Sequence, residues 1–133
     1  MAKEEKINKV EREYIIPLRE KCRVVPRYRK TEKAIKTLKE FIARHMKVVN
    51  RDLKKVKLDN YLNELMWIRG IKKPFHKIKI KAVKEGDIVR VYAVDLPDRL
   101  KFKKAREERI EKAAKDISEK KKAKKKVVEE ASK

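Results

Sequence analysis

Two stretches of this 133-residue chain carry side chains that could bind phosphate groups. The first runs from Glu20 to Lys39 and is dense in Lys and Arg, with Tyr28 among them. A guanidinium can hold a phosphate through two parallel N–H donors, and an aromatic ring can stack on a base. Together with Arg19 just before it, the stretch gives these predicted RNA-binding residues: Arg19, Lys21, Arg23, Arg27, Tyr28, Arg29, Lys30, Lys33 and Lys36. The alternative is a solvated loop followed by the outer face of a helix.

The second stretch surrounds Gly70 and continues into an alternating segment. Its predicted RNA-binding residues are Arg69, Lys72, Lys73, Lys77, Lys79 and Lys81, and His76 lies in the same basic stretch. Lys77, Lys79 and Lys81 share one side if the segment is a regular strand. A row of like charges on a sheet face is unfavourable unless something negative covers it. The alternative is a face open to water.

The overall charge favours the same kind of partner. The chain has 42 Lys and Arg against 21 Asp and Glu, for a formal net charge of +21. Self-repulsion at this charge costs folding energy unless a polyanion is the normal partner. Nucleic acid is the expected polyanion, because phosphate contacts release condensed counterions.

Other chemistries have little support in the sequence. Cys22 is the only cysteine, so a disulfide within the chain and a Cys-cluster zinc site are excluded. Its neighbours Lys21 and Arg23 could lower the thiol pKa, but an incidental cysteine is the favoured interpretation. Two Gly do not suffice for a Gly-rich phosphate loop, and no nucleophile motif is present. We predict no enzyme, no cofactor, no metal and no membrane segment, and a cytoplasmic location.

The spacing of apolar residues predicts the elements that position these side chains. From Arg12, alternating Tyr14, Ile16 and Leu18 predict a strand, and Pro17 indicates that this strand lies at a sheet edge or ends there. Residues 20–30 read as an irregular basic segment. Thr31 is a candidate N-cap for an amphipathic helix over residues 32–47.

A second, shorter helix is predicted over residues 60–69. Asp59 is its candidate N-cap, and Gly70 suits the left-handed residue that ends a helix. Trp67 invites a stacking role, although a core anchor is the favoured interpretation. A short strand is predicted over residues 56–58. The alternation after Pro74, a turn over residues 84–87 and the β-branched run 88–94 predict a hairpin.

These elements define an α+β fold. We predict a small single domain with an antiparallel hairpin, at least three strands and two main helices. Residues 1–11 are expected to be a flexible charged arm, and residues 12–98 the RNA-binding domain. Residues 99–133 contain 15 Lys or Arg and 7 Asp or Glu. They predict a Lys-rich helical extension to about residue 125, which a partner surface would order.

Three blocks of sequence resemble the archaeal and eukaryotic type of large-subunit ribosomal protein 31, which differs from the zinc-binding bacterial protein of that number. The blocks are Glu13–Arg19, Arg27–Met46, and the region holding Leu58-Asp59, Leu62-Asn63, Trp67, Gly70-Ile71, Pro74 and Ile78–Ile80. The resemblance covers roughly residues 12–95 and has an archaeal character. Residues 99–133 depart from the family pattern.

The resemblance implies a structural, non-enzymatic protein of the large ribosomal subunit. It implies partners as well: large-subunit ribosomal RNA, neighbouring ribosomal proteins, and factors that act on nascent chains near the polypeptide exit tunnel. Charge alone leaves two alternatives open. One is a DNA-coating, chromatin-like basic protein, and the other is an interaction module with an acidic protein partner.

Overall fold

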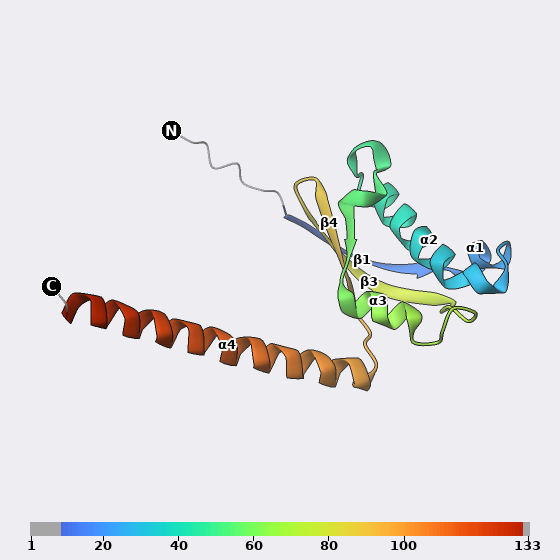
Figure 1. Ribbon diagram of the computed structural model, residues 1–133. Coiled ribbons are helices and arrows are strands. Elements are labelled where there is room, and N and C mark those ends of the chain that lie inside the picture. The colour runs from blue at the N-terminus through green and yellow to red at the C-terminus, as the bar shows by residue number, and fades with distance from the viewer. Residues whose placement is uncertain (1–8, 132–133) are drawn as a thin grey trace. The chain divides into compact units, whose positions relative to one another are not determined.

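The computed structural model describes residues 9–131 of the chain, with side chains through residue 119. It divides after Leu96 into two units (Figure 1). The first contains all the strands described, and the second contains one long helix. The predicted RNA-binding residues all belong to the first unit.

The first unit is built on a four-stranded mixed sheet in the order β1-β3-β4-β2. The strands are β1 (Lys9–Pro17), β2 (Val56–Leu58), β3 (Lys77–Glu85) and β4 (Ile88–Ala93). β3 pairs antiparallel with β1 and β4, whereas β2 pairs parallel with β4. The predicted hairpin is confirmed, with Gly86 at φ +60° in its turn. The edge position that Pro17 predicts for its strand is confirmed too.

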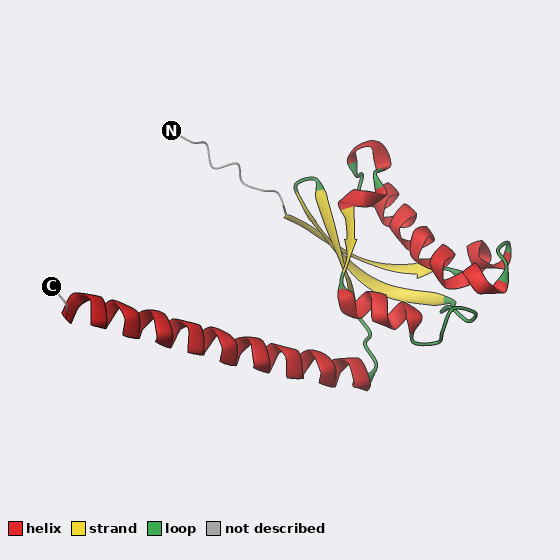
Figure 2. Ribbon diagram, in the orientation of Figure 1, coloured by secondary structure: helices red, strands yellow, loops and turns green. Residues whose placement is uncertain are grey.

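Two helices supply the other half of the core. They are α2 (Lys30–His45) and α3 (Asn60–Trp67), which lie beside the sheet in Figure 2. Alternate residues are buried along most of β3 and in β4, and so is one stripe of each helix, as a half-solvated sheet covered by amphipathic helices requires. The buried set includes Ile16, Ile78, Ile80, Ala82, Val89 and Val91 from the strands, Ala34, Leu38 and Ile42 from α2, and Leu62, Leu65 and Met66 from α3. The predicted α+β fold is confirmed.

The segment between β1 and α2 is more ordered than the sequence indicates. The irregular segment predicted over residues 20–30 instead contains the short helix α1 (Arg19–Arg23) and a 3-10 turn, η1 (Arg27–Arg29). Buried Leu18 and Cys22 hold α1 against the domain. Two further 3-10 turns, η2 (Val49–Arg51) and η3 (Leu53–Lys55), lead into β2. The flexible arm predicted over residues 1–11 was wrong for residues 9–11, because β1 begins at Lys9 and pairs there with β3. Residues 1–8 lie outside the described residues.

The helix starts differ from prediction in their hydrogen bonds. The N-cap of α2 is Arg29, so the prediction for Thr31 was wrong. Thr31 lies in the first helical turn, fully buried, and its hydroxyl bonds elsewhere. Asp59 does occupy the N-cap position of α3, but its side chain makes no capping hydrogen bond.

Trp67 lies at the end of α3 and does not anchor the core. It is 37% exposed, so the favoured prediction of burial was wrong, and Leu62, Leu65 and Met66 fill that role. The helix stops at Trp67, two residues earlier than predicted. Gly70 has φ +78°, the left-handed conformation predicted for it, and its N–H donates to the Trp67 carbonyl at 2.8 Å.

The second unit is formed by α4 (Asp98–Ala131), which extends beyond the predicted end near residue 125. Its described apolar side chains include Phe102, Ile110 and Ile117, all more than half exposed. None of the helices in the described residues is long and apolar enough to cross a lipid bilayer.

Candidate nucleic-acid interface

A basic hollow forms where the two predicted phosphate-binding stretches meet. It has a volume of about 620 Å³. Figure 1 shows α1 and the loop between α3 and β3 at the same end of the sheet. The side chains lining the hollow are Arg19, Cys22, Arg23, Lys30, Arg69, Lys72, Lys73, Pro74, Phe75 and His76. Six of the predicted RNA-binding residues therefore lie together, although about thirty positions separate the two stretches.

Hydrogen bonds from Thr31 join the start of α2 to the loop after α3, on the two sides of the hollow. Its hydroxyl lies 3.0 Å from both the Gly70 and the Ile71 carbonyl oxygens, and its backbone N–H donates to Ile71 at 3.2 Å. On the other side, the Leu18 N–H donates to the His76 carbonyl at 2.8 Å. The loop that carries Arg69, Lys72 and Lys73 is thereby fixed to the start of α2 and to the end of β1.

Arg69 and Phe75 form a stacked pair at the hollow. The guanidinium carbon of Arg69 lies 4.5 Å from the centre of the Phe75 ring, within the range of a cation–π contact. Phe75 is half-buried, whereas Arg69 is exposed. The sequence analysis missed Phe75, and the available signal was an aromatic residue placed directly after Pro74 in a basic stretch.

The positive charge of the hollow is not neutralised by the part of the chain that the structure describes. No carboxylate lines the hollow. Among residues 9–119, no ion pair involves Arg19, Arg23, Lys30, Arg69, Lys72 or Lys73. Like charges held this close repel one another, so an external anion in the hollow is stabilising.

Cys22 lies against the hollow as a buried neutral thiol. It is 5% exposed, and its sulfur donates weakly to the Lys30 carbonyl at 3.5 Å. Burial raises the pKa of the Cys22 thiol, and nearby Lys30 and Lys33 oppose that effect only in part. The alternative of a lowered pKa is therefore contradicted, and the residue has the environment of a structural cysteine.

The remaining residues of the first stretch lie outside the basic hollow. Arg29, Lys33 and Lys36 line a smaller depression of about 360 Å³ together with Glu32, which offsets part of their charge. The Arg29 guanidinium carbon lies 5.7 Å from the centre of the Tyr28 ring. Lys21, Arg27 and Tyr28 are exposed, and they line neither of these two depressions.

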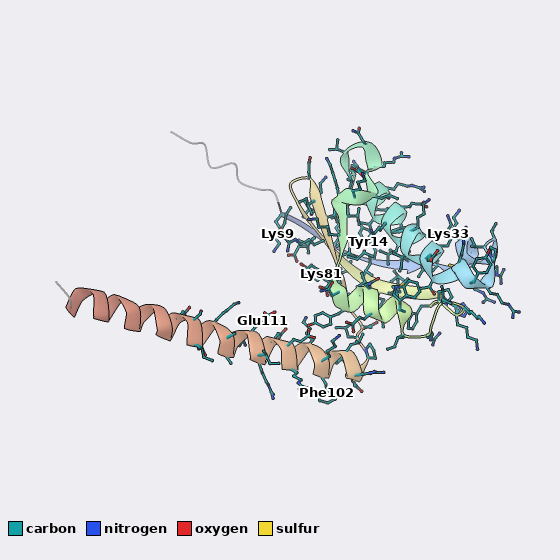
Figure 3. The ribbon with its side chains drawn as sticks, in the orientation of Figure 1. Lys9, Tyr14, Lys33, Lys81, Phe102 and Glu111 are labelled. Atoms are coloured by element: carbon teal, nitrogen blue, oxygen red, sulfur yellow. The ribbon has the colours of Figure 1, made fainter. Side chains whose placement is uncertain are left out.

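The outer face of β1 and β3 carries lysines that do have internal partners. Lys81 contacts Glu11 at 2.7 Å, Lys9 contacts Glu11 at 3.2 Å, and Lys79 contacts Asp95 at 3.6 Å. Glu13 lies directly opposite Lys81 in the strand register. Figure 3 labels Lys9 and Lys81 on this face, and Lys33 toward the other end of the domain.

The wholly basic strand face expected from the sequence is thus corrected to a mixed face. The negative cover for Lys79 and Lys81 comes from the chain itself. The hydrogen bond from Lys81 is the main cause of the lowered pKa of Glu11, and the hydrogen bond from Lys9 is the next. The hydrogen bond between Lys81 and Glu11 also raises the pKa of Lys81. Lys77 differs from them, because it makes no ion pair with the described residues.

Metal ligands do not gather in this interface. Within residues 9–119, no three His, Cys, Asp or Glu side chains lie close enough together to hold a metal ion. The hollow offers cationic hydrogen-bond donors and one contact between an arginine and an aromatic ring. This chemistry suits a phosphate-bearing polyanion, and a small α+β domain with such a surface is typical of nucleic-acid-binding proteins.

Comparison with known proteins identifies the class to which the domain belongs. The family model described as Ribosomal protein L31e matches residues 8–87, which cover β1 through the β3–β4 turn. The chain is 47% identical over 79 residues to the large ribosomal subunit protein eL31 of Methanocaldococcus jannaschii, covering 59% of this chain and 85% of that protein.

Other archaeal relatives agree. The large ribosomal subunit protein eL31 of Methanothermobacter thermautotrophicus is 47% identical over 78 residues, covering 59% of this chain and 89% of that protein. The eL31 protein of Methanococcus maripaludis is 41% identical over 85 residues, covering 64% and 96%. The chain therefore belongs to the L31e family of ribosomal proteins, and the resemblance noted in the sequence is confirmed. The matched family region ends before α4.

Proposed function

We propose that this protein binds ribosomal RNA through the basic hollow, as a structural constituent of the large ribosomal subunit. The observation that carries the proposal is the meeting of six cationic side chains in one hollow that no carboxylate lines. Phosphate oxygens would supply the missing negative charge, and the fixed loop geometry would select an RNA surface by shape. Relatives that bear the name large ribosomal subunit protein support the same role.

The family resemblance extends the proposal to position and partners. The protein would lie in the cytoplasm on the ribosome, near the polypeptide exit tunnel. There it would contact neighbouring ribosomal proteins and form part of the surface where factors acting on nascent chains dock. Its role would be structural and not catalytic. Membership of a ribosomal protein family disfavours the DNA-coating alternative.

The salt dependence of binding tests the phosphate contacts. With about six phosphate contacts, affinity for large-subunit RNA fragments should fall roughly a thousandfold between 50 and 200 mM salt. Filter binding with the full chain would measure the slope. A salt-independent affinity would contradict the proposal. An acidic protein partner would be favoured if RNA binding survived charge reversal at the hollow, in Lys72→Glu together with Lys73→Glu.

The C-terminal helix is proposed as a further contact of the assembled particle. Phe102, Ile110 and Ile117 give α4 an exposed apolar stripe beside its many charges. A helix so polar gains little stability by itself and gains more from a partner surface. Proteolysis should cleave residues 105–133 readily in the free protein and slowly in the ribosome. Equal protection in both states would count against this contact.

A further inference from the structure

The basic hollow combines several cationic side chains with the Arg69–Phe75 pair. Cations suit the phosphates of a nucleotide, and the Arg–aromatic pair suits its base. A patch that only gripped phosphates would need cations alone. Here the guanidinium carbon of Arg69 lies over the Phe75 ring, 4.5 Å from the ring centre. A guanidinium plane fixed in this way can stack on a base with its second face. Arg69 is exposed at the hollow and has no other ring contact among the described residues.

The size of the hollow suits more than a phosphate. Its volume of about 620 Å³ lies within the roughly 300–1,000 Å³ that small-molecule sites occupy. A duplex backbone running over the rim would leave most of this space empty. A nucleotide turned out of its helix would fit within it, with the base inside and the phosphates at the rim.

The positions of the cationic side chains agree with a base inside the hollow and phosphates at its rim. Arg19 and Arg23 come from α1, Lys30 from the start of α2, and Lys72 and Lys73 from the loop before β3. Cations on three separate segments can contact the phosphates on both sides of one nucleotide. Half-buried Pro74 and Phe75 supply the apolar surface for the base.

We infer that the basic hollow is a nucleotide pocket: it accepts one unpaired, extruded nucleotide of RNA, whose base stacks on the Arg69–Phe75 pair. The inference rests on the proposed RNA-binding function and adds to it the form of RNA that is recognised. Extruded bases that stack on aromatic rings and on arginine are a general mode of RNA recognition. Stacking tolerates any base, so the pocket selects an unpaired position and not a particular sequence.

Two RNA hairpins of the same stem sequence test the inference, one fully paired and the other with a single unpaired adenosine in the stem. The full chain should bind the bulged hairpin roughly tenfold more tightly, as expected for one base stacked on an aromatic surface. Phe75→Leu should bring the two affinities within about twofold of each other while binding of the paired hairpin is retained.

Arg69→Lys is the second variant, because it keeps the charge and removes only the flat guanidinium, on an exposed residue that the core does not need. It too should abolish the preference for the bulge. The matched control is Arg29→Lys, which changes the other Arg–aromatic pair, at Tyr28, and should leave the preference intact.

The outcomes separate this inference from the function on which it rests. Equal affinity of the unmodified chain for both hairpins would overturn the nucleotide pocket, and salt-dependent binding would still support the RNA-binding role. Persistence of the preference in both Phe75→Leu and Arg69→Lys would overturn it as well. Absence of binding to either hairpin and to large-subunit RNA fragments would overturn both.

Discussion

The basic hollow and the outer face of β1 and β3 are both rich in Lys, yet they differ in what surrounds the charges. In the hollow, Lys72 and Lys73 have no carboxylate among the lining residues. On the sheet, Lys79 and Lys81 contact Asp95 and Glu11. Local density of Lys and Arg therefore does not by itself mark a polyanion site. The pairing of each cation in the folded chain decides whether its charge is available.

The two surfaces also differ in the free energy that their charges contribute. Exposed ion pairs contribute little to stability, because water and salt screen them and side-chain entropy opposes them. The Lys81–Glu11 contact therefore serves mainly to cancel charge across the two strands. The hollow retains its repulsion until an anion enters, so we expect the free energy of RNA binding to be concentrated there.

The largest expected effect comes from removing charge at the hollow. Lys72→Gln with Lys73→Gln should weaken binding of large-subunit RNA fragments about fiftyfold near 100 mM salt, through the loss of two phosphate contacts. The slope of log affinity against log salt should fall by about two. Fluorescence anisotropy at several salt concentrations would measure both quantities.

The sheet face provides a control with the same change in net charge. Lys79→Gln with Lys81→Gln should alter the affinity by less than about threefold, since both lysines are already paired internally. An equal loss of affinity in the two double variants would show that net charge, and not the hollow, governs binding.

A smaller effect is expected at the hydroxyl that joins the two sides of the hollow. Thr31→Val removes the hydrogen bonds to the Gly70 and Ile71 carbonyls and should lower the free energy of unfolding by about 1–2 kcal/mol. Urea denaturation would measure the change. RNA affinity should fall as well, because the loop carrying Lys72 and Lys73 loses its anchor on α2.

Thr31→Ser is the matched control, because it keeps the hydroxyl and removes only a methyl group. Its RNA affinity should stay close to that of the unmodified chain. If Thr31→Val lost stability but bound RNA with unchanged affinity, the Thr31 hydrogen bonds would not be needed to position the RNA-binding residues of the hollow.

The smallest effect concerns Glu11 on the sheet face. Its folded-state pKa is lowered from the ordinary 4.5, chiefly by the hydrogen bond from Lys81 and then by that from Lys9. The stabilising contribution is therefore present above pH 4.5 and is lost as pH falls through the lower folded-state value. Glu11→Gln should be slightly less stable than the unmodified chain at pH 7, and the gap should close in strong acid.

Urea denaturation at neutral and acidic pH would follow this gap. In a Lys81→Gln background, Glu11→Gln should cost less stability at pH 7, because the main partner is already gone. A gap that stayed constant with pH would contradict the assignment of the pKa shift to these contacts.

Much of the fold could be predicted because periodicity and turn chemistry are local. The apolar stripe of α2, the Gly86 turn and the short strand β2 follow from neighbouring residues alone. Trp67 was misjudged because its side chain lies at the last turn of α3, where the helix leaves the core. Thr31 was misjudged because its partners, Gly70 and Ile71, lie about forty residues away.

The candidate site was predictable as two stretches but not as one hollow. Bringing Arg19 and Lys30 beside Arg69 depends on hydrogen bonds that join β1 and α2 to a distant loop. The cancellation of Lys81 by Glu11 depends on the register between β1 and β3, and a shift of one residue would place Glu11 on the other face. Neither the joining of the two stretches nor the contact between Lys81 and Glu11 can be predicted from neighbouring residues in the sequence.

Ultraviolet cross-linking of the assembled large subunit tests RNA binding at the basic hollow, because it reports which residues of this chain touch RNA. Mass spectrometry of the nucleotide-bearing peptides would locate the contacts. We predict cross-links within residues 69–76 and 19–30, with Phe75 among the modified residues. Cross-links confined to residues 9–13 and 77–81, with none at the hollow, would contradict the account.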